Sequence, residues 1–143
     1  MQVEFFQLNN SHAAAIAELE SEAFSVPWSL NQILSELSGT FSVCVGVRIA
    51  DKTIGYCFAR ALGTETEILR VAVLRAEQNR GVGEQLMRYV LTAAYAPEFY
   101  LECREGNAKA RRLYERLGFV SGGVRKNYYE SPTESGIIYK LSI

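Results

Sequence analysis

The sequence has few of the residues that build metal sites and disulfide frameworks. It contains one histidine, His12, and three cysteines, which are Cys44, Cys57 and Cys103. The cysteines are odd in number, lie far apart in apolar segments, and form no Cys-x-x-Cys pair. This pattern is typical of reduced thiols in the core of a cytosolic protein, and it predicts no metal site.

An excess of charge and a long apolar run are also missing. The formal net charge is −1, so the chain has no general attraction to nucleic acid or to an acidic membrane surface. No apolar run approaches the ~20 residues of a membrane span, and the segment MQVEFFQLNN lacks the basic and apolar parts of a signal peptide. The length of 143 residues and the hydrophobic content of 48% predict one cytoplasmic domain, residues 1–143, with a single core.

Apolar residues at helical spacing predict two helices near the N-terminus. One begins near Asn10 or Ser11, and its buried face is expected to contain Ile16, Leu19 and Ala23. The other begins at Ser29, which stands at capping-box spacing from Gln32. Its buried face is expected to contain Leu30, Ile33, Leu34 and Leu37.

The rest of the chain alternates between strand and helix patterns. Strands are expected at 41–47, 54–62, 67–73, 99–103, 119–120 and 136–143, and helices at 82–94 and 108–117. The apolar stripe of the first of these helices is expected to consist of Val82, Leu86, Tyr89, Val90 and Ala93. Asn107 is placed to cap the second helix and Gly118 to end it. An antiparallel meander followed by a right-handed parallel crossover over 71–103 predicts an α/β fold with a mixed sheet.

The stretch QNRGVG at 78–83 introduces a glycine-containing turn directly before a predicted helix. A dinucleotide-binding fingerprint does not fit, because Leu86 stands where the third glycine belongs and the turn does not directly follow its strand. A Walker A loop does not fit either, since no Gly-Lys-Ser/Thr follows. What remains is a turn whose N–H groups converge at a helix N-terminus, with Arg80 adding positive charge. This turn predicts a pyrophosphate cradle, and the alternative is an ordinary glycine-containing helix start.

Further motifs give the turn a family context. The turn follows VAV at 71–73 and precedes LECREGNAKARRLYERLGF at 101–119, and these pieces in order resemble the GNAT acetyltransferase superfamily. FSVPWS at 24–29 and RKNYY at 125–129 are similar to its branch that acetylates N-terminal amines, of the RimI type that modifies the N-terminal alanine of ribosomal protein S18. The resemblance spans nearly the whole chain. One departure is Arg70, where the RimI type more often has a small or an amide residue.

The resemblance implies acetyl-CoA as cosubstrate and splayed parallel strands around its thioester. The backbone of Val71, Ala72 and Val73 would pair with the pantetheine amides as an added strand does. The pyrophosphate would be held by Asn79, Arg80, Gly81, Val82, Gly83 and Glu84. Asn107 would contact the same molecule from the start of its helix, and its role as a plain N-cap is an alternative compatible with this one.

The same resemblance implies a catalytic pair. Glu102, at the end of a strand, would relay the proton of the acceptor ammonium through a water. Tyr114 lies two helical turns after Asn107, and its phenol would protonate the departing thiolate. A backbone N–H near Val71 would stabilise the oxyanion. The structural alternatives are a surface glutamate and a core tyrosine, and a covalent route through Cys103 lacks an activating base nearby.

For the acceptor, the RimI-type motifs imply an aromatic wall of Trp28, Tyr128 and Tyr129, although Trp28 has a core role as its alternative. An α-amino group has a pKa roughly 2.5 units below that of lysine, which is about 3.4 kcal/mol easier to deprotonate. One carboxylate base therefore suits a protein N-terminus, with ribosomal protein S18 as the expected partner. A lysine or small-molecule acceptor is the first alternative, and a non-catalytic acyl-CoA sensor is the second.

Overall fold

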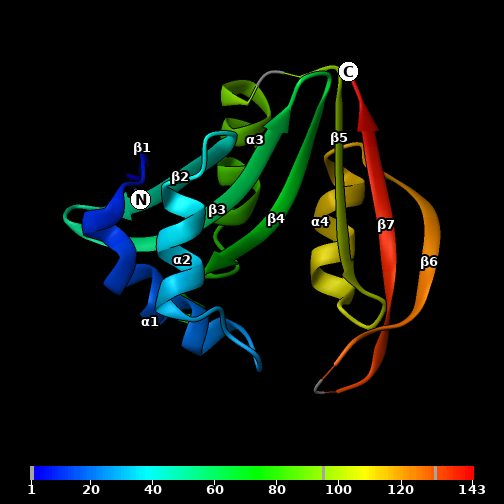
Figure 1. Cartoon of the computed structure of the whole chain (residues 1–143), viewed down its shortest axis with the longest axis horizontal. Helices are drawn as coiled ribbons and strands as arrows, with labels where there is room; N and C mark the ends of the chain where they lie inside the picture. The colour runs from blue at the N-terminus through cyan, green and yellow to red at the C-terminus, as the bar shows by residue number, and fades with distance from the viewer. Residues whose placement is uncertain (1, 95, 131) are drawn as a thin grey trace.

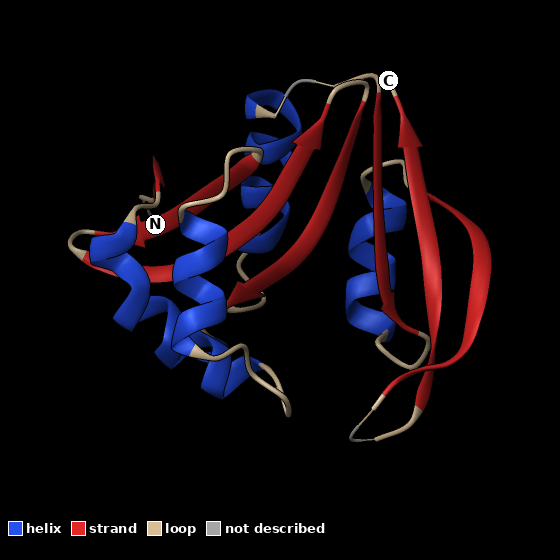
Figure 2. Ribbon diagram, viewed as in Figure 1, coloured by secondary structure: helices blue, strands red, loops and turns tan. Residues whose placement is uncertain are grey.

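The computed structural model describes residues 2–94, 96–130 and 132–143. Within these residues, one sheet of seven strands is accompanied by four α-helices and two short 3-10 helices (Figures 1 and 2). In chain order the elements are β1 (Glu4–Gln7), η1 (Asn10–His12), α1 (Ala13–Ala23), α2 (Leu30–Leu37), β2 (Ser42–Ile49), β3 (Lys52–Leu62), β4 (Glu65–Val73), η2 (Arg75–Glu77), α3 (Val82–Ala93), β5 (Glu98–Arg104), α4 (Ala108–Arg116), β6 (Val120–Tyr129) and β7 (Glu134–Ser142).

The strand order confirms the predicted mixed sheet. The order is β1-β2-β3-β4-β5-β7-β6, and every neighbouring pair is antiparallel except β4 and β5, which run parallel. The antiparallel meander β2-β3-β4 and the connection from β4 through α3 to β5 therefore occur as the sequence predicts.

The parallel strands β4 and β5, at the centre of the sheet, are paired over only part of their length. Register between β4 and β5 runs from Glu65↔Glu98 to Ile68↔Leu101, while β4 continues to Val73. Figure 1 shows the two strands side by side at one end and diverging toward the other. A bulge accompanies the divergence, because Ile68 and Arg70 pair with consecutive residues of β3 and Leu69 has no register partner there. Such bulges bend a strand, and the bend takes the second half of β4 away from β5.

Two apolar clusters lie on opposite faces of the sheet. One joins α3 and α4 to the sheet through residues such as Leu86, Met87 and Phe99, and the other joins α1 and α2 to it through Ile16 and Ile33. Figure 2 shows α1 and α2 in front of the N-terminal half of the sheet. In the described part of the chain no helix covers that same face of β5, β7 and β6 (Figure 2).

Local signals for helix ends are confirmed. The Ser29 side chain accepts from the Gln32 N–H at 3.1 Å, and the Gln32 side chain accepts from the Ser29 N–H at 2.7 Å. The Asn107 side chain accepts from the Ala110 N–H at 3.2 Å, and Gly118 has a φ of +99° after the end of α4. Each signal involves residues within one helical turn, so the sequence alone specifies it.

Several predicted positions are wrong. Ala23 and Leu30 are exposed, whereas Glu20 and Glu36 occupy the buried faces of α1 and α2. In α3 the predicted Tyr89 and Ala93 are exposed. The buried stripe consists of Val82, Leu86, Met87 and Val90, together with the C-cap residue Ala94. Tyr89 instead stacks on Phe5, with ring centroids 4.8 Å apart, because β1 lies beside β2.

The sequence also failed to predict two features of the strands. It did not predict β1, whose four residues are too few for a clear alternation and are ordered by pairing with β2. It expected only 119–120 as a strand where β6 extends to Tyr129. Two register irregularities against β7 and a positive φ of 53° at Asn127 interrupt the β6 pattern and hide its length.

Candidate active site

A cavity of about 780 Å³ lies where β4 and β5 separate. Five chain segments line it, and the residues are Ala23 to Trp28 with Gln32, Ile68 to Val71, Leu101 to Arg104, Asn107 with Ala110 and Tyr114, and Tyr128 to Glu130. The predicted residues Val71, Glu102, Asn107 and Tyr114 are therefore brought together with all three predicted aromatic residues. Ala72, Val73 and the turn 79–84 are not among the lining residues.

The glycine turn lies beyond the end of β4, at the start of α3. Gly81 is the N-cap of α3 with a φ of +79°, a conformation that favours glycine. The first hydrogen bond of the helix runs from the Gln85 N–H to the Gly81 carbonyl at 3.1 Å. The N–H groups of the preceding first turn, residues 82–84, have no carbonyl partner within the helix. Together with the helix dipole, these donors suit an anion.

Side chains tie this turn to its neighbours. The Gln78 amide donates to the Val73 carbonyl at 2.9 Å and accepts from Lys109 Nζ at 3.1 Å, which links the turn to β4 and α4. Arg80 pairs with Glu77 at 3.3 Å, and its side chain is 57% exposed. Arg88 and Arg116 hold the Glu84 carboxylate by hydrogen bonds and lower its pKa. The turn therefore has a fixed attachment on both sides and an added positive charge in solvent.

Glu102 lies on β5 beyond the last residue that pairs with β4. One carboxylate oxygen, Oε1, pairs with Arg125 Nε at 3.0 Å. Among the described residues its other oxygen, Oε2, has no hydrogen-bond partner, and it is one of two buried side-chain oxygens in that condition. Burial raises the pKa of this carboxyl and the charge of Glu67 raises it further, while Arg125 opposes both. The arrangement offers one unpaired carboxylate oxygen with more than ordinary affinity for a proton.

Tyr114 points from α4 into the same cavity. It is 9% exposed and lies against Phe119 and Tyr139, with ring centroids about 6 Å away in both cases. Burial raises the pKa of its phenol, and the neighbouring Cys103 and Cys57 act in the same direction. The phenol is therefore neutral and holds its proton throughout the physiological pH range.

The predicted aromatic residues lie on two sides of the cavity. Trp28 stacks on Phe58, with centroids 5.5 Å apart, so it contributes both to the core and to the cavity lining. Tyr128 and Tyr129 meet edge to face at 5.0 Å at the end of β6. Burial raises the pKa of Tyr129 to about 12, and Arg104 lies 4.7 Å over its ring.

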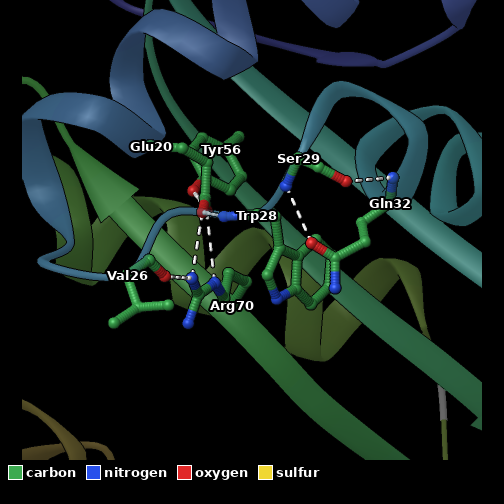
Figure 3. A network of polar contacts seen from close by, with 7 residues as sticks. All are labelled: Glu20, Val26, Trp28, Ser29, Gln32, Tyr56 and Arg70. Atoms are coloured by element: carbon green, nitrogen blue, oxygen red, sulfur yellow. Dashed lines mark hydrogen bonds and ion pairs between the residues drawn. The ribbon is translucent and has the colours of Figure 1, made fainter. Parts of the chain in front are cut away.

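A buried polar network supports the wall that contains Trp28, and of its members Val26, Trp28 and Arg70 line the cavity (Figure 3). The Glu20 carboxylate is fully buried and accepts hydrogen bonds from the Tyr56 hydroxyl and from the Trp28 N–H at 2.7 Å. Arg70 donates to it through Nε at 3.2 Å and Nη2 at 3.0 Å. Arg70 Nη2 also donates to the Val26 carbonyl at 3.1 Å.

Glu20 was not among the residues predicted from the sequence, and Arg70 was noted only as a departure from a family pattern. A signal was present for Glu20, because it follows Ile16 by four residues and therefore continues the buried face of α1. A carboxylate at such a position needs partners from elsewhere in the fold. Its partner Arg70 lies 50 residues away, so the pairing could not be found from spacing.

The three cysteines are buried and free, as the sequence predicts. Burial raises the pKa of Cys103 to about 11, and this thiol is therefore protonated near neutral pH. Across residues 2–94, 96–130 and 132–143, no group of three or more His, Cys, Asp or Glu side chains is placed to hold a metal ion. The helices in the same ranges are too short or too polar to cross a membrane.

This combination of splayed parallel strands, a glycine turn at a helix start and a buried carboxylate in the gap defines a class. Residues 13–119 match the Acetyltransferase (GNAT) family, and the chain belongs to this family. It is therefore a GNAT N-acetyltransferase, and members of the family use acetyl-CoA.

Individual relatives place it near the RimI enzymes. It is 34% identical over 128 residues to the N-alpha-acetyltransferase RimI of Mycobacterium tuberculosis, with 85% of this chain and 81% of that protein covered. The crystal structure of the ribosomal-protein-S18-alanine N-acetyltransferase of Escherichia coli superposes with a TM-score of 0.94 at 26% identity, covering 99% and 94% of the two chains. An uncharacterized protein of Mycobacterium leprae, ML0378, is 37% identical over 119 residues. That alignment covers 79% of this chain but only 33% of the longer protein.

Proposed function

We propose that this enzyme transfers the acetyl group of acetyl-CoA to the α-amino group of a protein N-terminus, with the N-terminal alanine of ribosomal protein S18 as the acceptor. The observation that carries the proposal is Glu102 Oε2, which is buried without a hydrogen-bond partner among the described residues, beside a cavity between separated strands. A carboxylate oxygen with this environment suits an ammonium group that must lose a proton. Reduced buried thiols are consistent with a cytosolic enzyme.

The second half of β4 provides the donor side. After Ile68 this strand has lost β5 as its neighbour, so the backbone edge of Val71 to Val73 is available for added-strand pairing with the pantetheine amides. Residues 79–84 would hold the pyrophosphate through backbone N–H groups at the start of α3. Gly81 supports this role because its left-handed conformation sets the direction of the turn. Asn107 would contact the same molecule, and its side chain is also the cap of α4.

Glu102 and Tyr114 divide the proton transfers between them. The amine nitrogen attacks the thioester carbonyl, a C–N bond forms and the C–S bond breaks. Glu102 takes the ammonium proton before attack, directly or through one water, and later releases it to solvent. Tyr114 gives its phenolic proton to the departing thiolate sulfur, and the phenolate regains a proton as the attacking nitrogen loses its second one to form the amide. A backbone N–H near Val71 stabilises the negative charge on the carbonyl oxygen. The products are the N-acetylated chain and free coenzyme A.

The acceptor assignment rests on the relatives and on acid–base chemistry. The E. coli neighbour is a ribosomal-protein-S18-alanine N-acetyltransferase, and an α-amino group needs about 3.4 kcal/mol less for deprotonation than a lysine. Trp28, Tyr128 and Tyr129 would contact the first residues of the acceptor from two sides of the cavity.

The proposal is tested with peptides that have the N-terminal sequence of S18 and either a free or a blocked terminus. Each peptide is incubated with acetyl-CoA, and thiol release and the site of acetylation are measured. We expect acetylation of the free alanine only. Acetylation of a lysine in the blocked peptide would show that the acceptor is a lysine and not an N-terminus. Binding of acetyl-CoA without turnover on any amine would refute the catalytic role.

A further inference from the structure

Two buried glutamates attach the N-terminal helices to the sheet in the same way. Glu20 in α1 pairs with Arg70 of β4, and Glu36 in α2 pairs with Arg60 of β3. Arg60 reaches Glu36 through Nη2 at 2.6 Å and Nε at 3.1 Å, which repeats the two-nitrogen contact of Arg70 with Glu20. The two pairs therefore have the same chemical groups and can be compared directly by substitution of their arginines.

The Glu20–Arg70 pair also bonds the backbone of the loop that follows α1. The segment after α1, residues 24–28, is held by this pair at its middle and at its C-terminal end, through the Val26 carbonyl on Arg70 and the Trp28 N–H on Glu20. The guanidinium of Arg70 lies 3.8 Å over the ring of Phe24 and 5.2 Å from that of Trp28. Figure 3 shows the hydrogen bonds that join Glu20 and Arg70 to Trp28 and Val26 of this loop.

The segment 24–28 forms the wall of the cavity on the face that carries α1 and α2. Phe24 and Trp28 pack into the cluster of that face, whereas Val82 at the start of α3 belongs to the cluster of the opposite face. The phosphate-binding turn and the loop thus approach the gap from different sides of the sheet. If the donor is held from the α3 side, the acceptor enters past residues 24–28.

We propose that Arg70 is a positioning residue that fixes the segment 24–28 as the acceptor wall, and that it thereby sets the affinity for the acceptor chain. This inference rests on the proposed function for its acceptor. Arginine is required because one planar guanidinium must bond a carboxylate, bond a carbonyl and stack on a ring at once. A lysine keeps the charge that Glu20 needs but offers a single point donor, so it cannot meet all three demands.

The test compares Arg70→Lys with the matched variant Arg60→Lys. For Arg70→Lys we expect the KM of the acceptor peptide to rise about tenfold, the fold-change of one lost charged hydrogen bond, with kcat and the KM of acetyl-CoA unchanged. Amide hydrogen exchange at residues 24–28 should become faster. Arg60→Lys should leave both measurements as in the wild type, because Arg60 is not among the residues that line the cavity.

A second variant protects the test against poor folding of Arg70→Lys. Phe24→Leu removes the stacking and leaves the ion pair, and it should raise the acceptor KM and the exchange at 24–28 in the same direction by a smaller factor.

Unchanged exchange at 24–28 in Arg70→Lys, or an equal rise of KM in Arg60→Lys, would overturn the inference. If the wild type acetylates no amine, the proposed function fails. The exchange measurement needs no turnover and still decides whether Arg70 holds the loop.

Discussion

Two walls of the cavity each contain a glutamate paired with an arginine, and the two pairs differ in how completely they are satisfied. On the wall built by α1 and β4, Glu20 is 0% exposed and accepts from Tyr56, Trp28 and two nitrogens of Arg70. On the wall built by β5 and β6, the side chain of Glu102 is 19% exposed and only its Oε1 is paired within the described residues.

The difference suits Glu20 to a structural role and Glu102 to the proposed role of base. A buried charge whose acceptor sites are all filled fixes the groups around it, and the Glu20 network accordingly joins α1, β3, β4 and the loop before α2. A partly satisfied carboxylate binds a proton more readily, which matches the raised pKa of Glu102. Glu20 is the more deeply buried of the two, yet both of its oxygens accept hydrogen bonds, so the number of donors distinguishes the two carboxylates.

The arginines differ in the same sense. The side chain of Arg70 is 19% exposed and that of Arg125 is 56% exposed. Solvent screens the Arg125 charge and weakens its hold on Glu102, while the Arg70 charge acts in a largely dry environment. Arg70 is therefore expected to matter for folding, and Arg125 for the protonation of its neighbour.

The largest expected effect is that of Glu102→Gln on catalysis. Loss of the base should lower kcat/KM by about 10²–10⁴-fold, as measured by thiol release with the S18 peptide. The fall should be steepest at low pH, where most of the acceptor is protonated. A rate that is retained, or one with the wild-type pH response, would remove Glu102 from the role of base.

Glu102→Gln should lower activity but should not lower the stability of the fold. Because the folded-state pKa of Glu102 is raised, the folded protein binds more protons than the unfolded chain between the two pKa values. The contribution of this group to stability is thus present below the unfolded pKa and is lost as pH rises through the folded pKa. At pH 7 the unfolding free energy of Glu102→Gln, measured in urea, should equal or exceed that of the wild type.

On the other wall, Arg70→Ala should lower the unfolding free energy by about 3–5 kcal/mol, because it leaves the Glu20 carboxylate buried without its cation. The matched change Arg125→Ala should cost less than about 1 kcal/mol, since that arginine is exposed. Both losses would be measured by urea denaturation at pH 7. Equal losses in the two variants would contradict the distinction between a structural and a reactive pair.

Tyr114→Phe extends the comparison to the second residue with a proposed catalytic role. Loss of the proton donor should lower kcat by about 10²-fold, the lower end of the range for such groups. The KM of acetyl-CoA should be unchanged, and the melting temperature should not fall, because the ring contacts with Phe119 and Tyr139 persist. Unchanged turnover would reduce Tyr114 to a packing residue.

What the sequence could predict is set by the range of the interactions. The capping of α2 by Ser29 and Gln32 and that of α4 by Asn107 depend on neighbours within one turn, and they are confirmed. The antiparallel meander and the parallel central pair followed from the alternation of helix and strand patterns. Glu102 and Tyr114 were chosen from motifs, and the fold places both in one cavity.

What the sequence could not predict depends on distant partners. Glu20 and Arg70 are joined across 50 residues, and their separate positions gave no sign of the network. The apolar stripe of α3 was placed partly on the wrong residues because Tyr89 finds its partner in β1, a strand too short to be predicted. The separation of β4 from β5 came from family resemblance, and the bulge at Leu69 that accompanies it has no local signature.

The smallest expected effect concerns Arg125 and the pH dependence of the reaction. Arg125 lowers the pKa of Glu102 against the larger effect of burial and the smaller one of Glu67. Arg125→Gln should therefore raise that pKa further, and the rise should be small because the arginine is exposed. Since Glu102 acts in its ionised form, the acid limb of the kcat/KM profile should move to higher pH, with equal rates at high pH.

Lys126→Gln is the control for this shift, because it removes a neighbouring positive charge from β6 that forms no ion pair with Glu102. Its profile should coincide with that of the wild type when the same peptide is used, so that the titration of the acceptor cancels. The charged groups that act on Glu102 are Arg125 of β6 and Glu67 of β4. A shift toward lower pH in Arg125→Gln, or an equal shift in Lys126→Gln, would mean that the 3.0 Å pair does not control the base. The Glu20–Arg70 and Glu102–Arg125 pairs would then differ only in what they contribute to the stability of the fold.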